Sequence, residues 1–171
     1  ASIKGFEKLD NGIIVTLDEK EKAPKKVRLE VINDKIIRVT ATAEKDFKDP
    51  ESLIIVDQDK KSSFVLSEDE DQIKLSTKSV IANVVKNTGE VKFTDKSGET
   101  FVQEQLGGGK KFKPYSCEQT HADGTPEIYN GWTTQTIFES PDDEAFFGLG
   151  QHQADEWNFK GKNEELFQYN T

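Results

Sequence analysis

The chain has 171 residues, which fits one domain large enough to bury a hydrophobic core. It carries 23 basic and 32 acidic residues, a net charge of -9, and the two signs are interleaved along the sequence. Binding to phosphates requires a concentrated positive surface, so this composition argues against nucleic acid as a partner. The hydrophobic fraction is only 33% and the charged fraction is 32%, so a folded domain is expected only if the apolar residues are regularly spaced.

The cysteine count and the absence of long apolar runs limit the class of protein. The single cysteine, Cys117, excludes an internal disulfide and a cysteine-based zinc site, and we expect a small, buried or half-buried side chain there. No run approaches the ~20 apolar residues of a membrane span, and no signal peptide is present. Both absences suit a cytoplasmic protein or a mature exported one, with a periplasmic or secreted location preferred. The chain lacks methionine and begins on strand-like sequence at Ala1, so we expect a processed or excised piece.

Alternation of apolar and polar residues in short runs is the dominant pattern, and it is typical of strands with one buried face. Residues 26–32 alternate in this way, with Val27, Leu29 and Val31 on the apolar side. Asn33-Asp34 then predicts a turn into a second strand over residues 35–41, so the two strands form a hairpin.

Further strands are expected at the roughly 8–12 residue spacing that is typical of a sandwich or barrel. No long amphipathic helix is visible, although residues 44–52 are compatible with a helical turn that ends before Pro50. The expected fold is therefore all-β, with two antiparallel sheets packed as a β-sandwich and little helix. The other predicted strands cover residues 6–9, 13–17, 72–76, 80–85, 91–94, 99–104, 133–138 and 144–147.

Two glycine-containing stretches do not qualify as nucleotide-binding motifs. Residues 107–111 read Gly-Gly-Gly-Lys-Lys, but a phosphate-binding loop needs Gly-Lys-Ser/Thr leading directly into a helix, and Phe112-Lys113-Pro114 follows here. We expect a mobile loop instead. Gly148-Leu149-Gly150 lacks the third glycine and the βαβ setting of a dinucleotide fingerprint. No cofactor is therefore expected.

Carboxylates are plentiful, but their spacing nominates no catalytic pair. A retaining glycosidase needs two carboxyl groups about 5–5.5 Å apart, whereas neighbours on a strand, such as Asp142 and Asp143, point to opposite faces. His121 and His152 lie far apart without a compact metal-ligand spacing, so we expect surface or structural roles and no metal site. The acidic run over residues 68–71 is interpreted as a solvated hairpin tip.

Residues 151–161 combine the groups that bind sugars. Aromatic rings stack on the apolar C–H faces of a sugar, while amides, carboxylates and imidazoles bind its hydroxyl groups. The alternative is an edge strand and loop in which Trp157 and Phe159 simply cover the core. The candidate substrate-binding residues are Gln151, His152, Asp155, Trp157 and Asn158.

Three stretches of the chain resemble the N-terminal β-sandwich of glycoside hydrolase family 31, the family of α-glucosidases and α-xylosidases. Residues 27–31 and 36–39 are similar to its early strand pair, and residues 75–80, 89–95 and 98–99 to its middle hairpins. The most diagnostic stretch is Phe147-Gly148-Leu149-Gly150, followed by residues 158–161 and by Asn170-Thr171. Family members commonly have Glu after this corner, whereas the chain has Gln151 and then His152, which resembles the branch of bacterial α-xylosidases.

The resemblance implies a galactose mutarotase-like supersandwich at the front of a retaining exo-α-glycosidase that acts on oligosaccharides. The family's catalytic aspartates lie in a (β/α)8 barrel, and its Trp-x-Asp-x-Asn-Glu-like motif does not occur in residues 1–171. No catalytic residue is therefore assigned here, and we expect a single domain truncated before the barrel, which is its expected partner. A sandwich loop near the substrate pocket is implied, and residues 151–160 or the segment up to Thr171 would supply it.

Two other classes of protein remain open from the sequence alone. One is a stand-alone carbohydrate-binding β-sandwich module with Trp157 and Trp132 as stacking platforms. The other is a non-catalytic adhesion or scaffold domain of an exported protein. The chain stops at Asn170-Thr171 without a closing strand, which we interpret as favouring the enzyme domain.

Overall fold

The computed structural model describes residues 1–49, 63–148, 150 and 155–166. The chain divides into two compact units, Ala1–Glu139 and Ser140–Thr171, and each is described by itself. Within the described ranges every regular element is a strand. None of these residues belongs to a helix of the length and apolar character that crossing a membrane requires.

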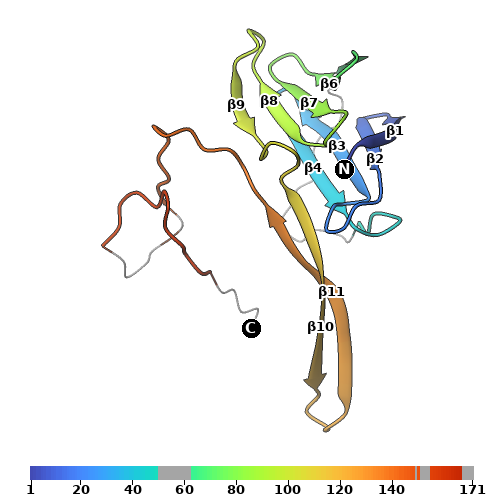
Figure 1. The fold of residues 1–171 in the computed structure, drawn as a ribbon, viewed down its shortest axis with the longest axis vertical. Coiled ribbons are helices and arrows are strands. Elements are labelled where there is room, and N and C mark those ends of the chain that lie inside the picture. The colour runs from blue at the N-terminus through green and yellow to red at the C-terminus, as the bar shows by residue number, and fades with distance from the viewer. Residues whose placement is uncertain (50–62, 149, 151–154, 167–171) are drawn as a thin grey trace. The chain divides into compact units, whose positions relative to one another are not determined.

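Besides a two-stranded hairpin, the first unit contains two larger antiparallel sheets in which sequential strands are neighbours (Figure 1). One sheet has four strands and the other has five, and each follows the order of the chain. The first is built from β1 (Ile3–Leu9), β2 (Gly12–Leu17), β3 (Lys26–Asn33) and β4 (Ile36–Thr42). The second is built from β5 (Val65–Glu68), β6 (Gln72–Ser76), β7 (Ile81–Val85), β8 (Val91–Thr94) and β9 (Thr100–Gln103).

The two sheets share one apolar core. Alternate residues of β2 and β3 point inward, and Ile13, Val15, Val27 and Leu29 are 0% exposed. The opposite sheet contributes aliphatic side chains from β6, β7 and β8 to the same cluster. The all-β sandwich expected from the sequence is confirmed, and so are the strand and inward face predicted for residues 26–32.

Polar contacts fasten the sheets to each other at their margins. Thr77 follows β6 and is 3% exposed, and its hydroxyl lies 2.6 Å from the carbonyl oxygen of Asp34 in the β3–β4 turn. At another margin the N–H of Ile3 donates to the carbonyl of Lys86 at 2.7 Å. A buried hydroxyl is costly unless it is hydrogen-bonded, so the Thr77 contact fixes one arrangement of the two hairpins.

A long hairpin completes the first unit. Strand β10 (Lys110–Thr120) pairs with β11 (Pro126–Thr136) along its whole length. Its root joins the five-stranded sheet, because Glu139 N–H donates to Gln103 O in β9 at 2.9 Å and Gln105 N–H, just after β9, donates to Ile137 O at 2.9 Å. The sequence predicted only the strand at residues 133–138, of which residues 133–136 fall in β11. Figure 1 shows the hairpin running beyond the sandwich.

The hairpin turn confirms a structural role for one histidine. His121 contacts the carboxylate of Glu127, and Tyr129 O–H donates to the same carboxylate at 2.6 Å. These hydrogen bonds, with the bond from Tyr129 having the larger effect, lower the pKa of Glu127.

The acidic run at residues 68–71 forms the tip of the β5–β6 hairpin, as expected. There Asp69 accepts hydrogen bonds from the N–H groups of Asp71 and Gln72.

Two predictions about local structure are wrong. Residues 144–147 were expected to form a strand, but they lie in irregular structure, since no strand among the described residues pairs with them. Residues 44–49 are bends and irregular chain rather than a helical turn. At the end of this stretch, two guanidinium nitrogens of Arg28 donate to the carboxylate oxygens of Asp49 at 2.9 and 2.6 Å. The rest of that prediction, residues 50–52, lies outside the described residues.

The glycines at residues 107–109 occupy positions where a side chain would be strained or would collide with the backbone. Gly107 and Gly108 have φ of 87° and 112°, a left-handed region that favours glycine. A Cβ on Gly109 would lie 2.3 Å from the carbonyl oxygen of Ile137. The Gly107 N–H donates to the Glu90 carboxylate at 2.7 Å. Each glycine therefore has a conformational or steric role, and the mobility expected for this loop stays a prediction.

Gly12 provides a test of the sandwich. A Cβ at this position would lie 1.9 Å from the carbonyl oxygen of Leu29 in the neighbouring strand. Gly12→Ala must therefore push β2 and β3 apart, and we expect a loss of about 2–4 kcal/mol in the free energy of unfolding. Gly5→Ala is the control, because no atom lies within 4 Å of its new methyl group. Urea unfolding of both variants measures the effect, and equal midpoints would contradict this close approach.

Candidate functional site

The described part of the segment predicted to bind sugar, residues 155–161, forms a turn that hydrogen bonds hold in place. Asn158 Oδ1 accepts the N–H groups of Phe146 and Lys160, each at 3.0 Å. The N–H of Phe159 donates to Phe146 O at 2.8 Å, and Lys162 N–H donates to Phe159 O at 3.0 Å. Asn158 therefore joins residue 146 to residues 158–160, and its side-chain oxygen is occupied by this task.

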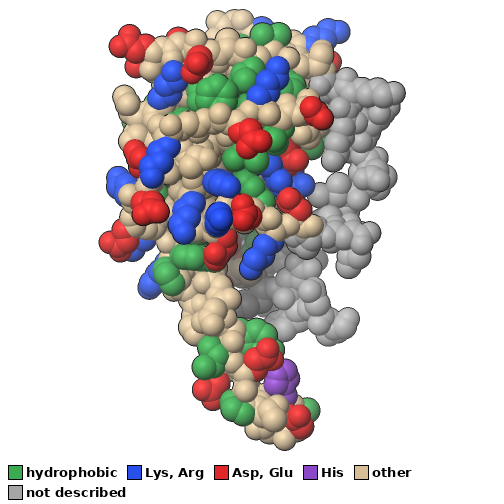
Figure 2. Space-filling view, turned by 90° about the vertical axis from the view of Figure 1, so that its right-hand side faces the viewer, with side chains coloured by type: hydrophobic (Ala, Val, Ile, Leu, Met, Phe, Trp, Pro, Cys, Tyr) green, Lys and Arg blue, Asp and Glu red, His purple; other side chains and the backbone are tan. Residues whose placement is uncertain are grey.

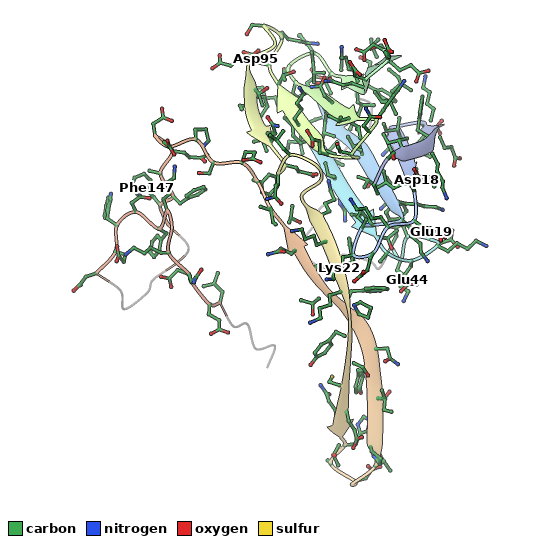
Figure 3. The ribbon with its side chains drawn as sticks, viewed as in Figure 1. Asp18, Glu19, Lys22, Glu44, Asp95 and Phe147 are labelled. Atoms are coloured by element: carbon green, nitrogen blue, oxygen red, sulfur yellow. The ribbon has the colours of Figure 1, made fainter. Side chains whose placement is uncertain are left out.

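Trp157 is the most exposed of the large hydrophobic side chains that the structure describes. Its residue is 83% exposed, and its ring meets the Phe147 ring edge-on at a centroid distance of 6.1 Å. Phe147, labelled in Figure 3, is itself 59% exposed. An aromatic pair of this size on a surface marks a site for a ligand or for another part of a protein. Phe159, in contrast, is buried, with 9% of the residue exposed.

The predicted site residues are only partly placed. Asp155, Trp157 and Asn158 are exposed and lie on the same turn. Gln151 and His152 lie outside the described residues. A sugar-binding role for the five candidates stays a prediction. The sequence did not show that Asn158 organises the turn, since its hydrogen-bond partners come from both sides of an irregular loop.

The far part of the β10–β11 hairpin carries apolar side chains on both faces. Residues opposite each other in the ladder share a face, so Cys117 and Tyr129 lie with Tyr115 on one side. Ile128 lies on the other face. Tyr115 is 54% exposed, Tyr129 40% and Ile128 64%, whereas Cys117 is half-buried as expected. Figure 2 shows hydrophobic side chains along this part of the molecule, below a sandwich whose visible surface mixes both signs of charge.

A buried charged cluster holds the root of this hairpin. The side chains of Glu104 and Lys110 are 5% and 9% exposed and form an ion pair. Glu104 also accepts the N–H of Val91 at 3.2 Å, so the pair bridges strand β8 and the start of β10. Burial lowers the pKa of Lys110, and the Glu104 charge opposes this shift. Sequence reasoning missed the pair, because Glu104 and Lys110 read as two ordinary surface charges.

Every resolved pKa shift of a described carboxyl group is downward. A general acid in glycoside hydrolysis has a raised pKa, which a buried or apolar environment provides. Where the described carboxyl groups have a shifted pKa, hydrogen bonds shift it down, most clearly to about 2 at Asp69. No group of three or more potential metal ligands occurs among the described residues. The other lowered carboxyl groups are Asp49, Asp95, Asp123 and Glu127.

Comparison with known proteins identifies related domains. The model of the glycosyl hydrolase 31 N-terminal galactose mutarotase-like domain matches residues 26–171. The crystal structure of a GH31 α-xylosidase from Xanthomonas citri matches 95% of the chain with a TM-score of 0.74 and 34% identity. A GH31 α-xylosidase from a soil metagenome, solved with xylose, matches 93% with a TM-score of 0.67 and 18% identity, which supports the fold alone. The chain spans only 16% and 24% of these two proteins.

The buried ion pair gives a prediction about stability. Lys110→Ala leaves the Glu104 carboxylate buried without its cation, which is expected to cost about 3 kcal/mol in the free energy of unfolding. The double variant Glu104→Gln/Lys110→Met removes both charges and is expected to recover part of this loss. Lys111→Ala is the matched control, since Lys111 is the exposed neighbour. Chemical unfolding should find Lys110→Ala the least stable, the double variant intermediate and Lys111→Ala the most stable. A Lys110→Ala protein as stable as Lys111→Ala would contradict the buried ion pair.

Proposed function

Because the chain belongs to the glycosyl hydrolase 31 N-terminal galactose mutarotase-like domain family, we propose that it is the non-catalytic front domain of a retaining exo-α-glycosidase. The catalytic (β/α)8 barrel is a further domain of the same protein, and residues 1–171 form one sandwich domain beside it. An α-xylosidase is favoured over an α-glucosidase, since the structure that shares 34% identity is named an α-xylosidase. Its substrates are oligosaccharides with a terminal α-linked sugar.

The observation that carries this proposal is the two-sided apolar hairpin. An isolated two-stranded hairpin is marginally stable in water, and a solvated hairpin normally keeps one polar face. Here Tyr115 and Tyr129 are exposed on one face and Ile128 on the other. Such a surface fits a position between other layers of a larger protein. The remaining length of the enzyme supplies those layers.

The turn that carries Trp157 is the part proposed to reach the substrate pocket. Its 83% exposed indole offers a stacking surface, and the carboxylate of Asp155 and the polar groups of Gln151 and His152 add hydrogen-bonding capacity. Asn158 contributes by holding the turn through Phe146 and Lys160. The turn adds binding and positioning, while the bond-breaking carboxylates come from the barrel.

Kinetics of the whole enzyme test this role. Trp157→Ala is expected to lower kcat/KM for an aryl α-xyloside by about 10–100-fold without abolishing it, because the catalytic groups of the barrel remain. Ile36→Ala is the control, since this 52% exposed side chain lies on the sandwich. The 171-residue chain alone should show no turnover.

Two results would contradict the proposal. Wild-type kinetics from Trp157→Ala would show that the turn does not contribute to the substrate pocket. Hydrolysis by the isolated chain that disappears when one of its own acids is replaced would place the catalytic centre within residues 1–171.

A further inference from the structure

A cavity of about 850 Å³ lies at the root of the hairpin, within the first unit. One wall is the β2–β3 loop from Asp18 to Lys25, a second is Ala43-Glu44 after β4, and the third is the hairpin root with Phe112 and Trp132. Figure 3 shows Lys22 and Glu44 beside this root, with Asp18 and Glu19 along the same edge of the sandwich. The cavity does not involve the turn that carries Trp157.

Trp132 has a fixed orientation in this cavity. Its indole N–H donates to Glu44 Oε1 at 2.8 Å, and the Phe112 ring meets it edge-on at 6.2 Å and 80°. The residue nevertheless remains 39% exposed. Since the N–H is already satisfied inside the protein, what Trp132 presents to a ligand is the apolar surface of its ring. An aromatic ring held in this way is a platform for the C–H face of a pyranose.

The charges around the platform favour a neutral ligand. The lining contains four acids, Asp18, Glu19, Glu21 and Glu44, and four lysines, Lys20, Lys22, Lys25 and Lys113. Their charges cancel, so neither an anion nor a cation gains a net attraction. Carboxylates accept and ammonium groups donate hydrogen bonds, and a polyhydroxylated molecule uses both kinds of partner.

The loop that faces Trp132 is tied to the hairpin. Phe112 N–H donates to Lys22 O at 2.8 Å, so the loop and the aromatic root keep a fixed separation. Lys22 has a φ of 63°, the one left-handed non-glycine residue among those described. This conformation costs a non-glycine residue free energy. The loop opposite Trp132 is therefore held in one defined conformation within the first unit.

We propose that this cavity is an accessory oligosaccharide-binding site, in which a pyranose stacks on Trp132 while Glu44 and the charged groups of the facing loop bind its hydroxyls. The choice of a sugar among neutral ligands rests on the proposed function. The site would hold a second part of a long substrate, or a product, on the front domain. It differs from the Trp157 turn in residues and in the unit that carries it.

Ligand titrations of the 171-residue chain test the site directly. Saturation-transfer NMR and calorimetry with maltotriose and with a xylose-α-glucose disaccharide should both detect binding. Trp132→Ala is expected to raise the Kd at least about tenfold. Trp132→Phe keeps an aromatic platform and should retain part of the affinity. Tyr115→Ala, on the other face of the hairpin, is the matched control and should bind like the unmodified chain.

Fluorescence supplies a readout that is specific for the platform. The chain has two tryptophans, so Trp157→Phe leaves Trp132 as the only indole, and its emission should change on titration with the sugar. Circular dichroism checks the fold of each variant. If Trp132→Ala does not fold, Glu44→Ala decides the question, because loss of the carboxylate should release the indole and weaken binding.

The outcomes separate this inference from the proposed function. No binding of either sugar, equal binding by folded Trp132→Ala, or displacement of the sugar by sodium sulfate would overturn the accessory site. Those results would leave the effect of Trp157→Ala on the whole enzyme intact. Conversely, sugar binding at Trp132 together with wild-type kinetics from Trp157→Ala would support this site and reject the proposed role of the turn.

Discussion

Burial of two apolar sheet faces against each other is the interaction on which the first unit depends. Ile13, Val15, Val27 and Leu29 from one sheet meet aliphatic side chains from the other, and all four are fully buried. Removal of this much apolar surface from water supplies the driving force, while contacts such as that of Thr77 with Asp34 select the arrangement. The loops and the hairpin that carry candidate functional groups are attached to this rigid base.

The hairpin is attached by polar contacts rather than by the apolar core. Glu104 and Lys110 are buried together at its root, and Glu139 N–H donates to Gln103 O in β9. Buried polar contacts of this kind demand one geometry, because a displaced partner would leave a charge unpaired. The far strands are therefore directed outward with their apolar residues exposed, and the cavity beside Trp132 is formed where the root meets the β2–β3 loop.

The sequence predicted those elements whose residues alternate strictly. Residues 26–32 and 72–76 did so and became β3 and β6, since one buried face produces a period of two. Most of β10 and β11 was missed, because their apolar residues lie on both faces and polar residues intervene. Residues 144–147 look like a strand but have no ladder partner in the part of the chain that the structure describes, and a strand requires a hydrogen-bonded neighbour as well as a suitable sequence.

The candidate sites were predictable in composition but not in geometry. The aromatic and polar content of residues 151–161 pointed to a functional segment, yet nothing in it indicated that Asn158 would hold the turn. Trp132 was visible as a possible stacking residue, whereas its partner Glu44 is 88 residues away in sequence. Contacts at such a separation arise only from the fold, and no local pattern reports them.

We propose that the rest of a larger enzyme completes this front domain and covers the β10–β11 hairpin. Hydrogen–deuterium exchange of the 171-residue chain and of the whole enzyme measures this directly. The account predicts that amides around Tyr115 and Tyr129 exchange rapidly in the isolated chain and are protected in the enzyme, while those of β2 and β3 are protected in both. Equally rapid exchange of the hairpin in both proteins would contradict it.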